Sequence, residues 1–126
     1  MRTDIKEALD RTQKLGVHLW KKHTAKRLDG ALPASQEVLA LAPAKWGNSA
    51  GLVVITKTHV LLFPGMDNMK SHSYRVAEIG NFRLKGGLFQ SKIKIFSSKN
   101  VNVKLAKKDA KMINQAWLGL QFDFED

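Results

Sequence analysis

Gly51-Leu-Val-Val-Ile-Thr56 and His59-Val-Leu-Leu-Phe63 are two apolar runs that are separated only by Lys57-Thr58. Two strand-like runs around a two-residue turn predict an antiparallel β-hairpin. The turn pair is not Asn-Gly, so the prediction rests on the flanking residues, which are rich in valine, isoleucine and leucine. A loop that starts at Pro64-Gly65 ends the hairpin.

The chain after this loop contains four more strand candidates and one helix. Strands are predicted over 71–76, 79–85, 91–96 and 101–105. The last two alternate apolar and polar residues, which is typical of strands with one buried face. A helix is predicted to begin near Lys108. Its apolar face consists of Met112, Ile113, Ala116, Trp117 and Leu120.

The residues before the hairpin predict one helix and one strand. The helix spans about Thr3 to Leu28, with Thr3 as its N-cap. Glycine is a weak helix former, so the helix can kink or break at Gly16. The strand covers 37–42, Pro43 ends it, and residues 46–50 form the turn that follows.

About seven short strands with a terminal helix predict a strongly bent sheet or a partly open barrel. Such a barrel has an open end, which the large side chain of Trp117 is suited to plug. We therefore expect an α+β, mainly β fold. The expected segments are an N-terminal amphipathic helix over 1–30, the sheet and its helix over 36–121, and an acidic aromatic tail over 122–126.

This order of motifs resembles the bacterial pleckstrin-homology-like (PH-like) domains, especially the YokE-like group. The shared features are the hairpin with its Leu-Leu-Phe ending, the Gly87-Leu-Phe turn before Lys92-Ile-Lys-Ile95, and the final helix. The resemblance covers roughly the last two thirds of the chain. It implies a PH-like sheet or partly open barrel with a C-terminal capping helix, to which this chain adds an N-terminal helix. It also implies a binding scaffold and leaves the ligand open.

Length and composition limit the class of protein. A chain of 126 residues with 44% hydrophobic residues predicts one globular domain. The chain has no cysteine, which excludes disulfides and Cys-ligated zinc. No segment approaches the roughly 18 apolar residues that a membrane span needs, and the charged first residues are unlike a signal peptide. We therefore expect a soluble, cytoplasmic protein.

The formal net charge is +10. A basic protein is attracted to nucleic acid, anionic membranes and acidic proteins alike, and its charge also keeps it soluble without any partner. Charge alone therefore does not identify the partner.

Strand alternation places the basic residues of the second half on one face. If the strands over 79–85, 91–96 and 101–105 are neighbours, their cations share the solvent face. These residues are Arg83, Lys85, Lys92, Lys94 and Lys104. The only acid between Arg83 and Lys111 is Asp109. The face is either an electrostatic docking surface or a solvated sheet whose lysines discourage aggregation.

Two further groups of residues are secondary binding candidates. The first lies on the N-terminal helix, and its apolar stripe is expected either to pack on the barrel or to bind a partner. It consists of Trp20, Lys21, Lys22, Lys26 and Arg27. The second is Lys45 with Trp46, and Trp46 is expected either to touch a lipid headgroup region or, as we favour, to pack on the barrel. In the family that the chain resembles, phosphoinositide binding is implied by basic residues around the loop that joins the first two strands. Here that loop covers 44–50 and carries Lys45 as its single cation.

Catalysis is not expected. The four histidines have no metal-binding spacing, and neither a phosphate-binding loop nor a nucleophile elbow is present. We therefore predict a noncatalytic module without metal or cofactor. Its partner is expected to be a protein or peptide, which binds the basic sheet face or the N-terminal helix. The alternative is nonspecific electrostatic binding to an anionic membrane or nucleic acid. The acidic tail is either a frayed end or a segment that docks on a second copy of the chain.

Overall fold

The computed structural model describes residues 2–12, 18–66, 69–88 and 90–125. Its elements are α1 (Thr3–Asp10), α2 (His18–Ala31), β1 (Val38–Trp46), β2 (Ser49–Thr56), β3 (His59–Pro64), β4 (His72–Arg75), the 3-10 turn η1 (Val76–Glu78), β5 (Asn81–Lys85), β6 (Gln90–Phe96), β7 (Asn100–Ala106) and α3 (Lys107–Glu125). The strands form one antiparallel sheet in the order β4-β3-β2-β1-β7-β6-β5.

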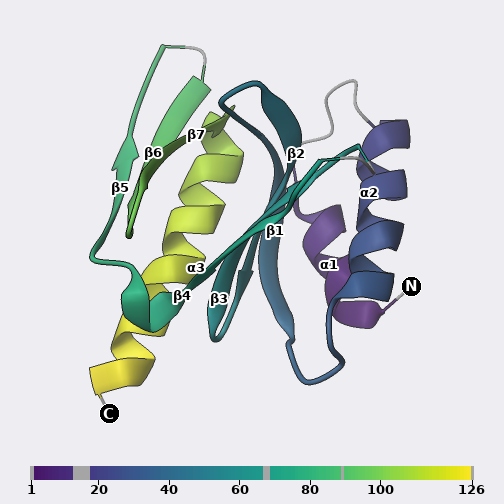
Figure 1. The fold of residues 1–126 in the computed structure, drawn as a ribbon, viewed down its shortest axis with the longest axis horizontal. Coiled ribbons are helices and arrows are strands. Elements are labelled where there is room, and N and C mark those ends of the chain that lie inside the picture. Colours follow the sequence, from purple (N-terminus) through teal and green to yellow (C-terminus); the bar gives the residue numbers. More distant parts are fainter. Residues whose placement is uncertain (1, 13–17, 67–68, 89, 126) are drawn as a thin grey trace.

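Two hydrophobic clusters lie on opposite faces of β1 and β2: the first includes α3, and the second includes α1 and α2. Figure 1 shows how these elements are arranged. α3 and strands β5 to β7 lie on one side of β1 and β2, whereas α1 and α2 lie on the other side. Val53 and Ile55 of β2 pack into the first cluster, and Leu52 and Val54 pack into the second. This burial on both faces explains the continuous apolar run of β2, which contrasts with the alternating pattern of β6 and β7.

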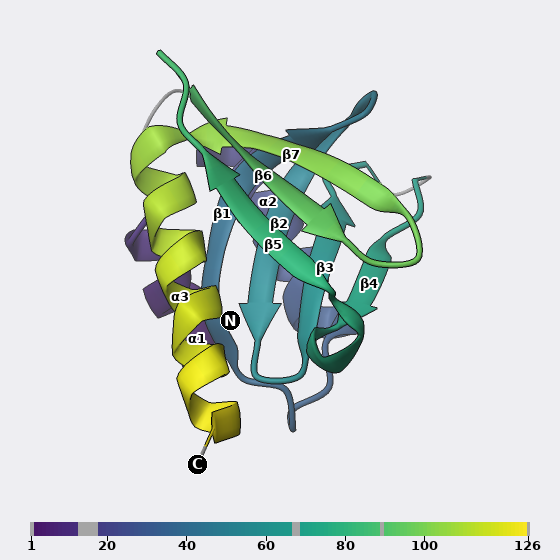
Figure 2. The same ribbon diagram turned by 90° about the vertical axis from the view of Figure 1, so that its left-hand side faces the viewer.

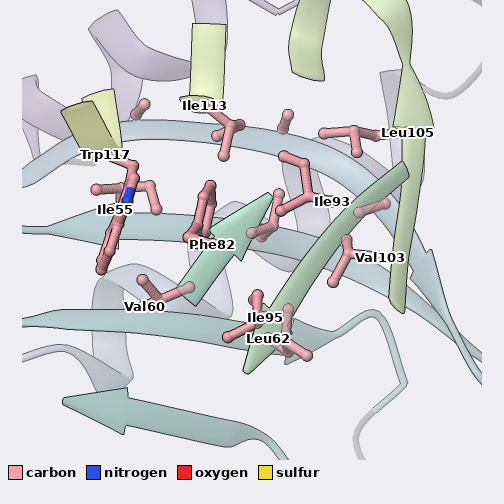
Figure 3. Packing of buried hydrophobic residues seen from close by; sticks show 14 of the residues in the cluster. Ile55, Val60, Leu62, Phe82, Ile93, Ile95, Val103, Leu105, Ile113 and Trp117 are labelled. Atoms are coloured by element: carbon pink, nitrogen blue, oxygen red, sulfur yellow. The ribbon is translucent and has the colours of Figure 1, made fainter. Parts of the chain in front are cut away.

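The C-terminal helix closes the first cluster, as the sequence predicted. Trp117 is only 6% exposed and stacks on Phe82 of β5, with ring centroids 4.7 Å apart and an interplanar angle of 16°. Figure 3 shows both rings among Ile55, Ile93 and other aliphatic side chains of the sheet. Trp117 therefore joins α3 to the edge strand β5 by a direct aromatic contact.

The prediction of a single helix from Thr3 to Leu28 is wrong. The structure has two helices there, α1 and α2, and α2 continues to Ala31. The expected break at Gly16 lies outside the described residues. The apolar side chains of the two helices, including Ile5, Leu9 and Leu28, pack against the sheet in the second cluster. Packing on the sheet is therefore confirmed for these apolar residues.

The start of α1 differs from the expected Thr3 cap. Arg2 is the N-cap residue, and it makes no side-chain capping bond. The Arg2 guanidinium instead pairs with the Asp4 carboxylate, with Nη2 and Oδ2 3.0 Å apart, and also donates to the carbonyl oxygens of Leu32 and Pro33. Asp4 Oδ2 accepts the Val38 N–H at 2.7 Å. These contacts attach the first turn of α1 to the segment that leads into β1.

The surroundings of Asp4 have opposing effects on the pKa of its carboxyl group. Burial alone would raise the pKa of this carboxyl group, but the hydrogen bond from the Val38 N–H and the adjacent Arg2 guanidinium outweigh it and lower the pKa. Asp4 thus contributes most to stability in its charged form.

Three element boundaries also differ from the sequence prediction. β1 does not end at Pro43 but continues to Trp46, and the turn narrows to Gly47 and Asn48. Among the described residues of β1, only Lys45 and Trp46 pair with β7. Proline has no backbone N–H, and at Pro43 no hydrogen bond to β7 is needed. Gly47 has a positive φ of 56°, a conformation that glycine adopts without steric cost.

The other two boundaries lie farther along the chain. Residues 76–78 form the 3-10 turn η1, so the strand expected over 79–85 begins only at Asn81. The acidic end of the chain is not a separate tail, because α3 continues through Glu125. In the described part of the chain, no helix combines the length and the apolar character needed to cross a membrane.

Candidate functional site

The outer side of β5, β6, β7 and the end of β1 carries six cationic side chains, which we call the basic face. Its members are Lys45, Arg83, Lys85, Lys92, Lys94 and Lys104. The strands β5, β6 and β7 lie in front in Figure 2, with their outer side toward the viewer. Their apolar partners point inward, as the alternation predicted: Phe82, Ile93, Ile95, Val103 and Leu105 are all buried.

Strand pairing aligns four of these residues in one line, which we call the lysine row. Lys85 lies opposite Lys92, Lys92 opposite Lys104, and Lys104 opposite Lys45. Directly paired residues point to the same side of a sheet, and neighbouring strands are about 4.8 Å apart. The row therefore crosses four adjacent strands and is about 14 Å long at the backbone.

A second, shorter line runs beside the lysine row. Arg83 lies opposite Lys94, and Lys94 lies opposite Asn102. The ammonium group of Lys94 lies over the Phe96 ring, 5.8 Å from its centroid. This cation–π contact and the half-buried state of Lys94 hold the side chain near the sheet.

The basic face keeps its positive charge unneutralised within the described part of the chain. None of its six cations forms an ion pair there. Asp109, the one acid between Arg83 and Lys111 in the sequence, is 4% exposed. Like charges directly opposite one another destabilise a sheet, so this arrangement costs stability in the free protein.

A pocket of about 330 Å³ lies at the β5 end of the lysine row. Its lining includes three members of the row together with two glycines of the β5–β6 turn and two polar residues at the start of β6: Lys85, Gly86, Gly87, Gln90, Ser91, Lys92 and Lys104. A Cβ atom at Gly87 would lie 2.2 Å from the Gln90 carbonyl oxygen, so only glycine fits there. Leu88, at the turn itself, is 82% exposed.

The structure brings the five predicted face residues together and adds Lys45 to them. Lys45 was predicted as part of a separate loop, but it lies in β1 and pairs with Lys104. Its neighbour Trp46 is 6% exposed and packs in the first cluster, so the favoured packing is confirmed and its ring does not reach the surface.

Of the secondary candidates on α2, the side chains of Lys22, Lys26 and Arg27 are described, and Arg27 lies apart from the pocket that the two lysines line. Arg27 is half-buried: its guanidinium lies 5.1 Å from the centroid of the Phe63 ring, and Nη1 donates to the Pro64 carbonyl oxygen at 2.9 Å. Lys22 and Lys26 are exposed and line a pocket of about 390 Å³ between α1 and α2. The side chains of Trp20 and Lys21 lie outside the described residues.

No pattern in the sequence predicted the β1–β7 pairing that completes the row. Strands β1 and β7 are far apart in the chain, and they are joined in register only at Lys45 and Trp46 among the described residues. The pocket residues Gln90 and Ser91 were missed for a similar reason, because the β5–β6 turn is defined by close backbone packing at Gly87.

The arrangement of the strands and α3 is similar to that of solved bacterial pleckstrin-homology domains. A DUF1696 family protein with a pleckstrin-homology domain from Shewanella loihica superposes with a TM-score of 0.55 and 16% identity, over 79% of this chain and 95% of that chain. A pleckstrin homology domain from Shewanella amazonensis gives a TM-score of 0.44 and 21% identity, over 69% of this chain and 84% of that chain. No protein-family model and no curated protein match the sequence. The first similarity confirms the expected PH-like fold.

Proposed function

We propose that the protein is a noncatalytic binding module that docks an acidic protein or peptide on its basic face. The observation that carries this proposal is the register of the lysine row, in which Lys92 faces a like charge on each side without an ion-pair partner in the described part of the chain. A row of unneutralised cations costs stability in the free protein, and an anionic partner removes that cost. The PH-like fold supports the proposal because a rigid sheet holds the cations in fixed register.

Affinity capture with matched charge reversals tests this proposal. The test variant is Lys92→Glu/Lys94→Glu/Lys104→Glu on the basic face. The control variant is Lys57→Glu/Lys99→Glu/Lys111→Glu, which changes the net charge equally at exposed positions on two turns and α3. Both proteins and the wild type are incubated with nuclease-treated native lysate, and captured proteins are identified by mass spectrometry. We expect an acidic protein that the control retains and the test variant loses. Equal captures by all three proteins contradict the proposal.

A second candidate is nonspecific electrostatic attachment to an anionic membrane or nucleic acid, which the net charge of +10 favours. Salt separates the two candidates. Nonspecific phosphate binding falls steeply as salt rises, whereas a shape-complementary protein interface loses less. Binding to anionic vesicles or duplex DNA that the control and test variants reduce equally, and that disappears at moderate salt, supports this second candidate.

A further inference from the structure

We propose that the lysine row receives an acidic α-helix of the partner protein, which lies across the strands and presents one carboxylate per turn. This inference rests on the proposed function and specifies the shape of the partner. It follows from the spacing of the cations, from their position on the face of the sheet, and from the state of the nearby sheet edge.

The spacing of the lysine row matches the pitch of a helix. Neighbouring residues of the row are about 4.8 Å apart, and the four lysines span about 14 Å. Carboxylates that recur once per helical turn are about 5.4 Å apart, so four of them span about 16 Å. Four carboxylates on one side of an extended segment span about 20 Å, because its side chains point the same way only every second residue. The lysine side chains therefore need to shift less to reach the carboxylates of a helix than to reach those of an extended segment.

The position of the row on the sheet face also favours a helix. A helix satisfies its backbone hydrogen bonds internally, so it can lie on a face that offers only side chains. An extended segment gains most when its backbone pairs with an open sheet edge. The nearest edge strand is β5, and its Phe82 N–H already donates to Asn81 Oδ1 at 2.9 Å. A strand added at β5 would lie beside one end of the lysine row only, whereas a helix that lies across the face can reach all four lysines.

Leu88 extends the complementary surface beyond one end of the row. It follows Lys85 by three residues and is 82% exposed, the highest value among the exposed large hydrophobic side chains of the described residues. A partner helix that covers Lys85 places its next turn close to this side chain. We therefore expect an apolar residue one turn beyond the last carboxylate of the stripe, which would cover Leu88 and fix the direction of the helix.

Three synthetic peptides of identical composition test the inference. The stripe peptide has about 16 residues, carries glutamate at positions i, i+4, i+7 and i+11, and ends in leucine one turn later. The dispersed peptide has the same residues with the glutamates spread around the helix. The blocked peptide has the stripe sequence with D-amino acids at two central positions, which prevent the helix. Fluorescence anisotropy measures each affinity at low and physiological salt.

We expect the stripe peptide to bind at least fivefold more tightly than the other two. The double variant Lys92→Gln/Lys104→Gln should weaken its binding about threefold to tenfold, and Leu88→Ser should weaken it without changing the salt dependence. The control Lys57→Gln/Lys99→Gln should leave the affinity unchanged. Far-UV circular dichroism of each variant verifies the fold.

The outcomes that contradict the inference are distinct from those that contradict the proposed function. Equal affinities for the stripe and blocked peptides refute the helix but leave an acidic partner in place. If no acidic peptide binds with an affinity that depends on Lys92 and Lys104, while vesicles or DNA bind, the proposed function itself is refuted.

Discussion

Replacing the central lysine of the row should stabilise the free protein. Lys92 lies directly opposite Lys85 on one side and Lys104 on the other. Two ammonium groups about 8 Å apart repel by about 0.5 kcal/mol in water before screening. Two such neighbours give about 1 kcal/mol, which Lys92→Gln removes. For a chain of this size, the melting temperature should rise by about 3–4 °C.

Urea unfolding at two salt concentrations measures this effect. Near 0.01 M salt the Debye length is about 30 Å, and near 1 M it is about 3 Å, so the gain should be present at low salt and almost absent at high salt. Lys92→Glu should add a further gain of similar size, because it turns both repulsions into attractions. Lys57→Gln, on the exposed β2–β3 turn, is the matched control and should change stability little.

Two results would contradict the predicted repulsion: a lower free energy of unfolding in Lys92→Gln, or a gain in stability that is the same at both salt concentrations. The first result would mean that the half-buried stem of Lys92 contributes more through packing than its charge costs. The second would mean that the gain comes from side-chain packing or strand propensity and not from charge.

Three other substitutions test separate parts of the structure. Trp117→Ala should lower the free energy of unfolding by about 3–5 kcal/mol in urea titration, because it empties the centre of the first cluster. Gly87→Ala should weaken binding of the stripe peptide by distorting the β5–β6 turn, whereas Gly86→Ala, which meets no atom within 4 Å, should not. Asp4→Asn should cost about 1–3 kcal/mol at neutral pH, since the Val38 N–H and the Arg2 guanidinium lose a charged acceptor. Because the pKa of Asp4 is lowered, its carboxylate stabilises the fold above about pH 4, and this stabilisation is lost as the pH falls through the folded-state pKa. Unfolding measured against pH should therefore show a smaller acid destabilisation in Asp4→Asn than in the wild type.

The strands were predictable where local pattern determines their environment. The alternation in β6 and β7 placed Ile93 and Val103 inside and the lysines outside, and the two-residue turn fixed the β2–β3 hairpin. The extent of β1 was not predictable, because a proline usually ends a strand. The structure accommodates Pro43 because that part of β1 lacks a β7 partner among the described residues.

The candidate site was only partly predictable for a related reason. Which side chains share a face follows from period 2 within each strand, so five cations could be assigned to one surface. Which of them lie directly opposite one another depends on register, and register between distant strands is set by packing of the whole sheet. The inclusion of Lys45 in the row was therefore seen only in the structure.

The burial of β1 and β2 on both faces has a consequence for how the chain can be shortened. A fragment that starts at residue 36 would keep every strand and α3 but would uncover Leu41, Leu52, Val54 and Phe63 together. Such a contiguous apolar surface on a sheet promotes self-association. By covering these side chains, the N-terminal helices keep the apolar face of the sheet away from solvent and from other molecules. Any natural relative that lacks them must replace these side chains with polar ones or cover the surface with another chain.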